Sequence, residues 1–138
     1  MNIHASCVSL NDKGILLLGK SGIGKSDLTL RLIEQLGAVL VADDRVDLIK
    51  KNNNIYASCP KNITGLLEVR GLGIISKPYL SETCINLVVE LVSDFNLIER
   101  LPERQYYEFE QQQVQKIKIY PFEQSAVYKI KAACDEIG

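Results

Sequence analysis

Residues 19–26 read Gly-Lys-Ser-Gly-Ile-Gly-Lys-Ser, and their types and spacing suit the binding of a phosphate chain. They fit the pattern G-x-x-x-x-G-K-[ST]. Glycines let the backbone curl so that successive N–H groups point at one anion. The lysine reaches the outer phosphates, and the final hydroxyl can ligate Mg²⁺. The candidate phosphate-binding residues are Gly19, Lys20, Ser21, Gly22, Ile23, Gly24, Lys25 and Ser26.

A loop of this kind needs a strand before it and a helix after it, because the helix N-terminus contributes free N–H groups and positive potential. Gly14–Leu18 is a short apolar run typical of a buried parallel strand. From Asp27 onward, leucine and isoleucine recur on one helical face until Gly37, a natural C-terminal stop. This setting favours a phosphate-binding loop over a chance glycine-rich turn.

Two adjacent carboxylates, Asp43 and Asp44, follow the next apolar run, Ala38–Ala42. A strand that follows a strand–helix unit is expected to lie parallel to the first strand, with its carboxyl end at the edge where the loop lies. There the pair could bind Mg²⁺ through water, or one carboxylate could take a proton from an attacking hydroxyl. The alternative is a turn, in which aspartate is common. The position beside the loop favours function.

The rest of the chain predicts a mixed sheet with flanking helices. Asn2–Leu10 reads as a strand joined by a tight turn to the strand before the loop. Val46–Lys50 and Asn54–Ser58 read as a second hairpin, which departs from simple strand–helix alternation. His4 lies near the start of the first strand, where residue type alone favours a structural or solvated role.

Two segments carry polar residues in less regular patterns. Glu68 and Arg70 are embedded in the apolar segment Leu66–Ile75. Buried charges are costly unless paired, so these residues are expected to pair with each other or to meet a ligand or metal. Glu103–Gln113 is polar and reads as a helix or a mobile segment. A final helix is expected after Ser125, whose hydroxyl can cap it.

The length indicates one domain over residues 1–138, long enough for a single hydrophobic core, and the expected strands and helices make it an α/β domain. The net charge of -1 does not favour binding to nucleic acid, and no apolar run is long enough to span a membrane. The N-terminus lacks the regions of a signal peptide. The cysteines are scattered without a C-x-x-C pair, which is typical of free thiols in a reducing cytosol. We therefore expect a cytoplasmic protein without nucleic acid or membrane partners.

Three segments together resemble the catalytic domain of HPr kinase/phosphorylase. They are the loop at 19–26, Val-Ala-Asp-Asp-Arg-Val-Asp at 41–47, and Leu-Leu-Glu-Val-Arg-Gly-Leu-Gly-Ile-Ile at 66–75. The loop pattern alone occurs in many families, whereas the other two at this order and spacing are far more specific. The resemblance spans nearly the whole chain, weakens after Ile75, and does not include the family's N-terminal domain. The chain therefore resembles a short form made of the catalytic domain.

That resemblance implies an ATP-dependent serine kinase acting on HPr, the phosphocarrier protein of the sugar phosphotransferase system. Many members also remove the phosphate, using inorganic phosphate and releasing pyrophosphate. The implied fold is a phosphate-loop domain related to PEP carboxykinase, with a mixed sheet and flanking helices, usually assembled as a hexamer. Two alternatives stay open: a non-catalytic ATP-binding regulatory module, and a small-molecule kinase with the same loop.

The resemblance also implies roles for particular residues. ATP would bind at residues 19–26, with Lys25 bridging its phosphates, and Ser26 and Glu68 would hold Mg²⁺. Asp44 would be the base that accepts the serine proton. His4 and Arg100 would complete the catalytic site.

One departure from the family pattern concerns charge. The family usually has an Arg-Pro-Gly-Arg-like loop near its C-terminus, where this chain has Tyr-Pro-Phe-Glu-Gln at 120–124. The chain therefore carries two fewer positive charges there, and we expect an enzyme biased toward the kinase direction.

Overall fold

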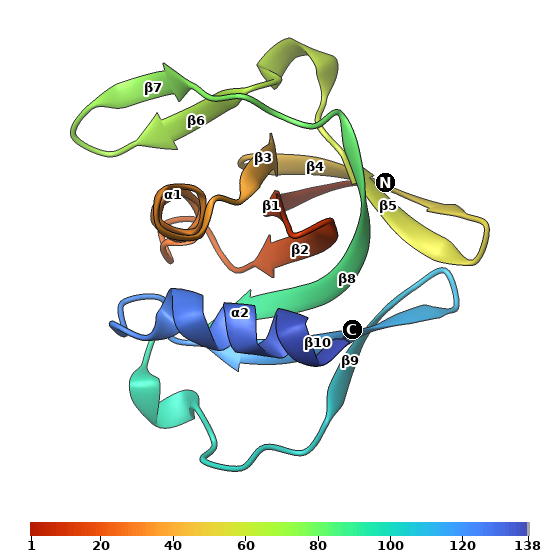
Figure 1. Ribbon diagram of the computed structural model, residues 1–138, viewed down its shortest axis with the longest axis vertical. Coiled ribbons are helices and arrows are strands. Elements are labelled where there is room, and N and C mark those ends of the chain that lie inside the picture. Colours follow the sequence, from red (N-terminus) through yellow and green to blue (C-terminus); the bar gives the residue numbers. More distant parts are fainter. Residues whose placement is uncertain (138) are drawn as a thin grey trace.

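The computed structural model describes residues 1–137, which fold into a curved mixed sheet and two α-helices (Figure 1). The strands are β1 (Asn2–Leu10), β2 (Lys13–Leu18), β3 (Val39–Ala42), β4 (Arg45–Lys51), β5 (Asn54–Ser58), β6 (Leu66–Val69), β7 (Gly73–Ser76), β8 (Glu82–Leu91), β9 (Gln105–Phe109) and β10 (Gln112–Ile119). The helices are α1 (Lys25–Leu36) and α2 (Ala126–Ile137), with short 3-10 turns η1 (Lys61–Ile63) and η2 (Phe95–Leu97). Within the described residues, neither α-helix has the length and apolar character that crossing a membrane requires.

All strands except β6 and β7 form two layers that share β1 and β8. The larger layer runs in the order β3-β1-β2-β8-β10-β9, with β8 parallel to both β2 and β10 and the other neighbours antiparallel. The first residues of β1 and β8 leave this layer and pair with the hairpin β4–β5. The predicted mixed sheet and both predicted hairpins are therefore confirmed.

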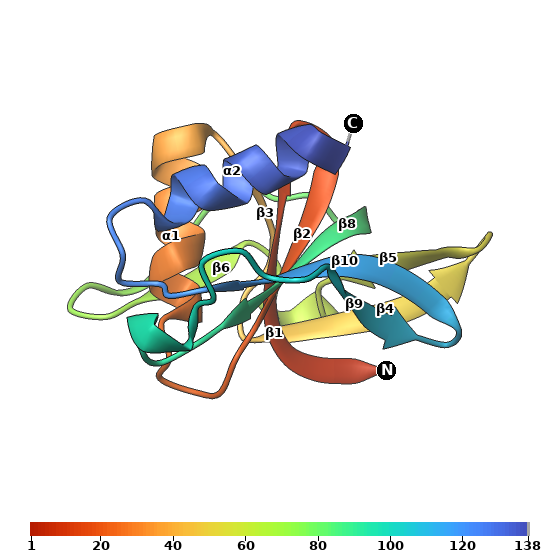
Figure 2. The ribbon, with the colours of Figure 1, turned by 90° about the horizontal axis from the view of Figure 1, so that it is seen from below.

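Two apolar clusters hold these layers together. One lies between the larger layer and the helices, which Figure 2 shows on one side of the strands. It joins Leu28 and Leu32 of α1 to Val127 and Ile130 of α2. The other cluster lies between the two strand layers and includes Leu48. Side chains alternate between the faces of a strand, which is why β1, β2 and β8 contribute to both clusters.

β3 runs in the direction predicted from the strand–helix pattern, but it is not the neighbour of β2. Both strands pair antiparallel with β1, which lies between them. They are therefore parallel to each other, and Asp43 and Asp44 follow the carboxyl end of β3 as predicted. The N-terminal strand takes the central position because its length lets it pair with β2, β3 and β4 at once.

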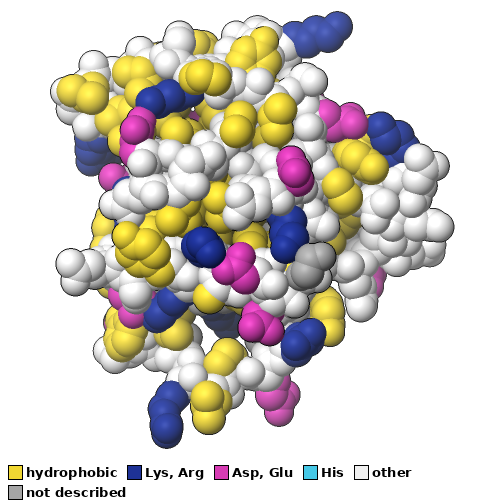
Figure 3. All heavy atoms as spheres, in the orientation of Figure 1, with side chains coloured by type: hydrophobic (Ala, Val, Ile, Leu, Met, Phe, Trp, Pro, Cys, Tyr) yellow, Lys and Arg dark blue, Asp and Glu magenta, His cyan; other side chains and the backbone are white. Residues whose placement is uncertain are grey.

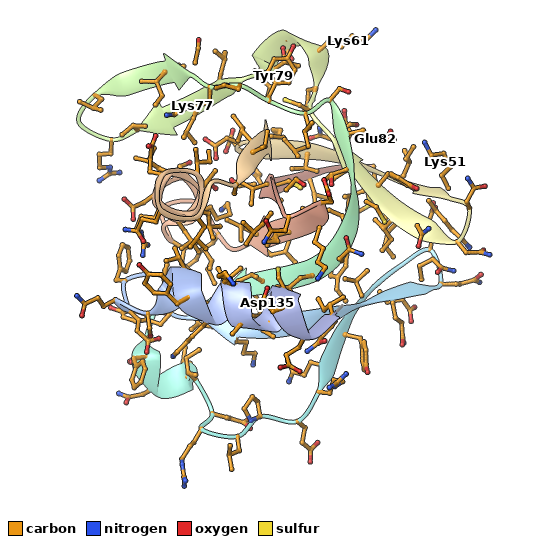
Figure 4. The ribbon with its side chains drawn as sticks, viewed as in Figure 1. Lys51, Lys61, Lys77, Tyr79, Glu82 and Asp135 are labelled. Atoms are coloured by element: carbon orange, nitrogen blue, oxygen red, sulfur yellow. The ribbon has the colours of Figure 1, made fainter. Side chains whose placement is uncertain are left out.

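The expectation that Glu68 and Arg70 are buried is wrong, since both residues are exposed. They belong to the separate hairpin β6–β7, where Leu67 is buried. Only one face of this two-stranded hairpin packs against the rest of the protein, so alternate residues of each strand face solvent. Lys77 holds the hairpin to α1 by an ion pair with Glu34. Figure 4 shows Lys77 on the segment that runs from β7 to β8.

The expected helix at Glu103–Gln113 is wrong, because this segment forms most of the hairpin β9–β10. Its turn is formed by Glu110 and Gln111, both with positive φ. Polar residues are tolerated because β9 is the edge strand of its layer, where most side chains face solvent. Phe109 is its buried anchor in the cluster between the layers.

Gly14 of β2 lies against the backbone of β8, and a Cβ atom there would be 2.2 Å from the carbonyl oxygen of Cys84. Gly14→Ala is therefore expected to lower the free energy of unfolding by about 3 kcal/mol, because a backbone oxygen in a paired strand cannot move aside. Gly37→Ala is the control, since its Cβ meets no atom within 4 Å and only the left-handed φ of 74° opposes it. That variant should lose about 1–2 kcal/mol. Urea denaturation measures both, and equal losses would contradict the clash.

Candidate active site

The glycine-rich loop, residues 19–24, connects β2 to the first turn of α1. Gly22 and Gly24 have φ of 82° and 115°, which residues with a Cβ atom rarely adopt. Gly24 is the N-cap of α1, and no side chain caps the helix there. The first N–H groups of the helix therefore lack intrahelical and side-chain cap partners, and the helix dipole makes this end positive. Such a terminus favours an anion.

Lys25 folds back over this loop from the first position of α1. Its Nζ donates hydrogen bonds to the carbonyl oxygens of Gly19 and Lys20, the latter at 3.1 Å. Burial lowers the pKa of Lys25, while the negative charges of Asp44 and Asp43 act to raise it. No carboxylate oxygen of the described residues lies within 4.0 Å of the Lys25 Nζ. A bound polyanion would therefore stabilise its charged form.

Asp43 is buried at the end of β3 and links three elements. Its carboxylate accepts hydrogen bonds from Ser6 Oγ of β1 at 2.7 Å and from Ser26 Oγ of α1 at 2.9 Å. The backbone N–H of Glu68 in β6 donates to its other oxygen at 3.4 Å. With its proton directed at Asp43, the Ser26 hydroxyl keeps its lone pairs for a cation.

Ser6 did not emerge from the sequence as a site residue. The available signal is its position two residues after His4, because alternate residues of a strand share a face. A hydroxyl in an otherwise apolar stretch of β1 was the second sign.

Asp44 has a different environment from its neighbour. Its side chain is 71% exposed, and its φ of 72° lies in the left-handed region. Its Oδ1 lies 3.5 Å from Nδ1 of His4, across the start of β1. One aspartate is thus held by hydroxyl groups, while the other has a free carboxylate oriented toward solvent and a histidine. This difference suits Asp43 to positioning and Asp44 to proton transfer.

The structure therefore brings Lys25, Ser26, Asp43, Asp44 and His4 to one edge of the sheet. The backbone of Glu68 joins them through Asp43, and its exposed carboxylate forms no hydrogen bond or ion pair with residues 1–137. No contact in the part of the chain that the structure describes connects Arg100 with these residues. It is exposed in the loop between η2 and β9. Figure 1 shows that loop at the bottom of the molecule and the hairpin β6–β7 at the top.

The oxygen donors fit a magnesium ion that also binds phosphates. Mg²⁺ is usually held by one or two protein carboxylates together with water and substrate phosphates. The Ser26 hydroxyl and the Asp43 carboxylate are hard oxygen ligands 2.9 Å apart, and Glu68, whose backbone N–H bonds Asp43, carries a further carboxylate. Residues 1–137 contain no group of three or more His, Cys, Asp or Glu that could hold a metal alone. Phosphate oxygens would complete the coordination.

The model of the family described as HPr Serine kinase C-terminal domain matches residues 1–130. The chain belongs to this family. A protein named HPr kinase/phosphorylase from Lactobacillus acidophilus is 41% identical over 100 residues, which cover 67% of this chain and 31% of that protein. Its namesake from Clostridium acetobutylicum is 45% identical over 96 residues, covering 64% of this chain and 31% of that protein. The chain spans about a third of the length of these curated relatives.

Among solved structures, the chain is similar to the Hpr(Ser) kinase/phosphatase from Coxiella burnetii. The TM-score is 0.86 at 27% identity, and the match covers 99% of this chain and 95% of that chain. This member of the HPr Serine kinase C-terminal domain family therefore has the same α/β fold, with a mixed sheet and two helices. The resemblance read from the three sequence segments is confirmed.

Proposed function

We propose that the protein is a kinase that transfers the γ-phosphoryl group of ATP to a serine of an HPr-type phosphocarrier protein. The proposal rests above all on the two aspartates beside the start of α1, one buried against Ser26 and the other exposed beside His4. The names of the relatives and of the similar structure, all referring to HPr, support the choice of substrate. A phosphate-loop domain related to PEP carboxykinase, assembled as a hexamer and acting in the cytoplasm, completes the proposal.

In this proposal the glycine-rich loop and the N-terminus of α1 bind the phosphates through backbone N–H groups. Lys25 exchanges its carbonyl partners for phosphate oxygens. Mg²⁺, held by Ser26 and Glu68 with Asp43 in support, would neutralise charge on the phosphates. Phosphoryl transfer needs positioning and charge stabilisation more than covalent catalysis, and these residues supply both.

Asp44 is the proposed general base. It accepts the proton as the serine oxygen forms a bond to the γ-phosphorus and the bond to the β–γ bridging oxygen breaks, so ADP leaves. His4 orients its carboxylate from 3.5 Å. Arg100 could contribute charge only if its loop moved or another copy of the chain supplied it, and its catalytic role stays a prediction.

The forward reaction is tested by incubating the protein with ATP, Mg²⁺ and HPr and measuring the mass of intact HPr by mass spectrometry. We expect the mass of HPr to increase by one phosphoryl group. An HPr variant whose accepting serine is replaced by Ala should show no increase. Nucleotide binding without any added mass would favour the regulatory module instead. ADP formation with transfer of the phosphoryl group to a small hydroxyl compound, but not to HPr, would favour the small-molecule kinase.

The reverse reaction is expected to be slower than the forward reaction by about tenfold or more. Phosphorolysis brings inorganic phosphate against phosphoserine, so two anions must approach and positive charge matters more than for a neutral hydroxyl. In the segment 120–124 the single charged residue is Glu123, which pairs with Lys129 at 2.7 Å. Pyrophosphate release from phosphoserine-HPr at saturating phosphate, compared with the ATP-driven rate, measures the ratio. Gln124→Arg should raise the reverse rate selectively, and comparable rates in the unaltered protein would contradict the bias.

A further inference from the structure

We propose that Phe95, Tyr120 and Phe122 form an aromatic platform on which the purine base of the nucleotide stacks. This inference rests on the proposed function, because it assumes that the triphosphate occupies the glycine-rich loop. It assigns a role to the segment 120–124, which carries aromatic side chains where positive charge was expected.

The order of the strands decides on which side of the loop the base must lie. Asp43 follows β3, which is separated from β2 by β1, so the metal and the γ-phosphate belong on that side. On the other side of β2 lie β8 and β10, both parallel to it. Figure 1 shows the arrowheads of β2, β8 and β10 at the same edge. Ligands of such sheets bind beyond the carboxyl ends of the strands.

The three aromatic residues lie beyond those two carboxyl ends. Phe95 follows β8, while Tyr120 and Phe122 follow β10. The ring centroids of Phe95 and Tyr120 are 6.4 Å apart and those of Tyr120 and Phe122 are 5.9 Å apart, both edge to face. A Cβ atom at Gly24 would lie 3.3 Å from the Phe122 ring, so this ring touches the loop itself. The platform is therefore continuous with the proposed phosphate site.

The platform is open to a ligand. Phe95 is 52% exposed and Phe122 is 61% exposed, so both rings keep a large apolar area in contact with solvent although each packs edge to face with Tyr120. Figure 3 shows hydrophobic side chains gathered at the left edge of the molecule, over η2 and beside the start of α2. The flat aromatic face of a purine base can stack on the exposed face of one of these rings and meet the edge of the next, and stacking of this kind needs no hydrogen bonds to the base.

The segment that carries the platform is held in place before any ligand binds. Arg31 of α1 donates to the carbonyl oxygen of Pro121, which ties the segment to the helix that follows the loop. The Lys129 ammonium donates a hydrogen bond to the Glu123 carboxylate and lies 5.7 Å from the centre of the Phe95 ring. Because these side chains lose little conformational freedom when the base binds, more of the stacking energy contributes to the affinity.

Calorimetry with two probes isolates the contribution of the base. The probes are Mg-ATP and Mg-tripolyphosphate, which share the phosphate chain but differ in the nucleoside. We expect the unaltered protein to bind Mg-ATP about tenfold or more tightly than Mg-tripolyphosphate. Phe122→Ala should lower the affinity for Mg-ATP by roughly five- to a hundredfold and leave the affinity for Mg-tripolyphosphate unchanged. Tyr106→Ala, on the edge strand β9, removes an aromatic ring of 49% exposure and is the matched control.

The outcomes separate the platform from the proposed function. If the unaltered protein binds both probes equally, or Phe122→Ala weakens both equally, the platform is wrong while the phosphate site stands. If Phe122→Ala changes only the KM for HPr, the rings contact the protein substrate and the base lies elsewhere. If the unaltered protein binds neither probe, the proposed function fails and the platform with it. A selective loss of Mg-ATP affinity, reproduced by Phe95→Ala, supports the platform.

Discussion

Lys25→Ala is expected to reduce kcat/KM for HPr phosphorylation by at least about a hundredfold, comparable with the loss of one preorganised donor to a transition-state anion. Lys25 is the cation that lies over the glycine-rich loop, and its Nζ is bonded to carbonyl oxygens rather than to a carboxylate. Bonds from an ammonium group to neutral carbonyl oxygens are weaker than bonds to an anionic phosphate, so the side chain is available to a polyanion.

The same substitution should leave the fold intact. Burial lowers the pKa of Lys25, so keeping its charge in the folded protein is costly and the alanine removes that cost. Thermal unfolding should give a melting temperature close to that of the unaltered protein. Lys50→Ala, an exposed residue of β4, removes the same charge away from the loop as the control. Normal affinity for Mg-ATP and normal turnover in Lys25→Ala would remove the basis of the proposed function.

Asp44→Asn should keep nucleotide binding and lose about 10²–10⁴-fold in the rate of transfer to HPr, since an amide cannot accept the serine proton. Asparagine is the suitable replacement because Asp44 has a φ of 72°, and asparagine tolerates the left-handed region. Asp12→Asn is a matched control, being an exposed aspartate at φ 65° in the turn between β1 and β2. Single-turnover transfer and Mg-ATP affinity measured on both variants separate catalysis from binding.

Asp43→Asn should give the opposite pattern. Asp43 accepts hydrogen bonds from Ser6 and Ser26, so an amide in its place sets an N–H group against one of these hydroxyls. Magnesium-dependent nucleotide affinity and the free energy of unfolding should both fall, the latter by about 1–3 kcal/mol. If Asp43→Asn keeps nucleotide affinity and stability but loses transfer, while Asp44→Asn is fully active, the two roles are exchanged.

The loop and the pair of aspartates were predictable because their determinants are local in the chain. Glycines at fixed spacing, an apolar run before them and an amphipathic helix after them specify a strand–loop–helix unit within residues 14–37. The next apolar run then has to return parallel to the first, which puts Asp43 and Asp44 at the edge that carries the loop. The hairpins of β1–β2 and β4–β5 were likewise predictable, because Asn11 and Asn52 suit turns with positive φ.

The polar segment 103–113 was not predictable in the same way. Its residues have weak periodicity, and only pairing with β10 and burial of Phe109 make the segment a strand. Local propensity cannot supply a partner strand.

The sequence by itself determined the strand–loop–helix unit, the mixed sheet and the edge at which the candidate residues gather. Only the tertiary structure decided that Asp43 is buried against Ser6 and Ser26 while Asp44 is exposed beside His4. It also decided that the aromatic platform of Phe95, Tyr120 and Phe122 lies against Gly24. The physical reason is the range of the interactions: turn geometry and helical periodicity act over a few residues, whereas burial and side-chain contacts depend on strands far apart in the chain that pair only in the folded protein.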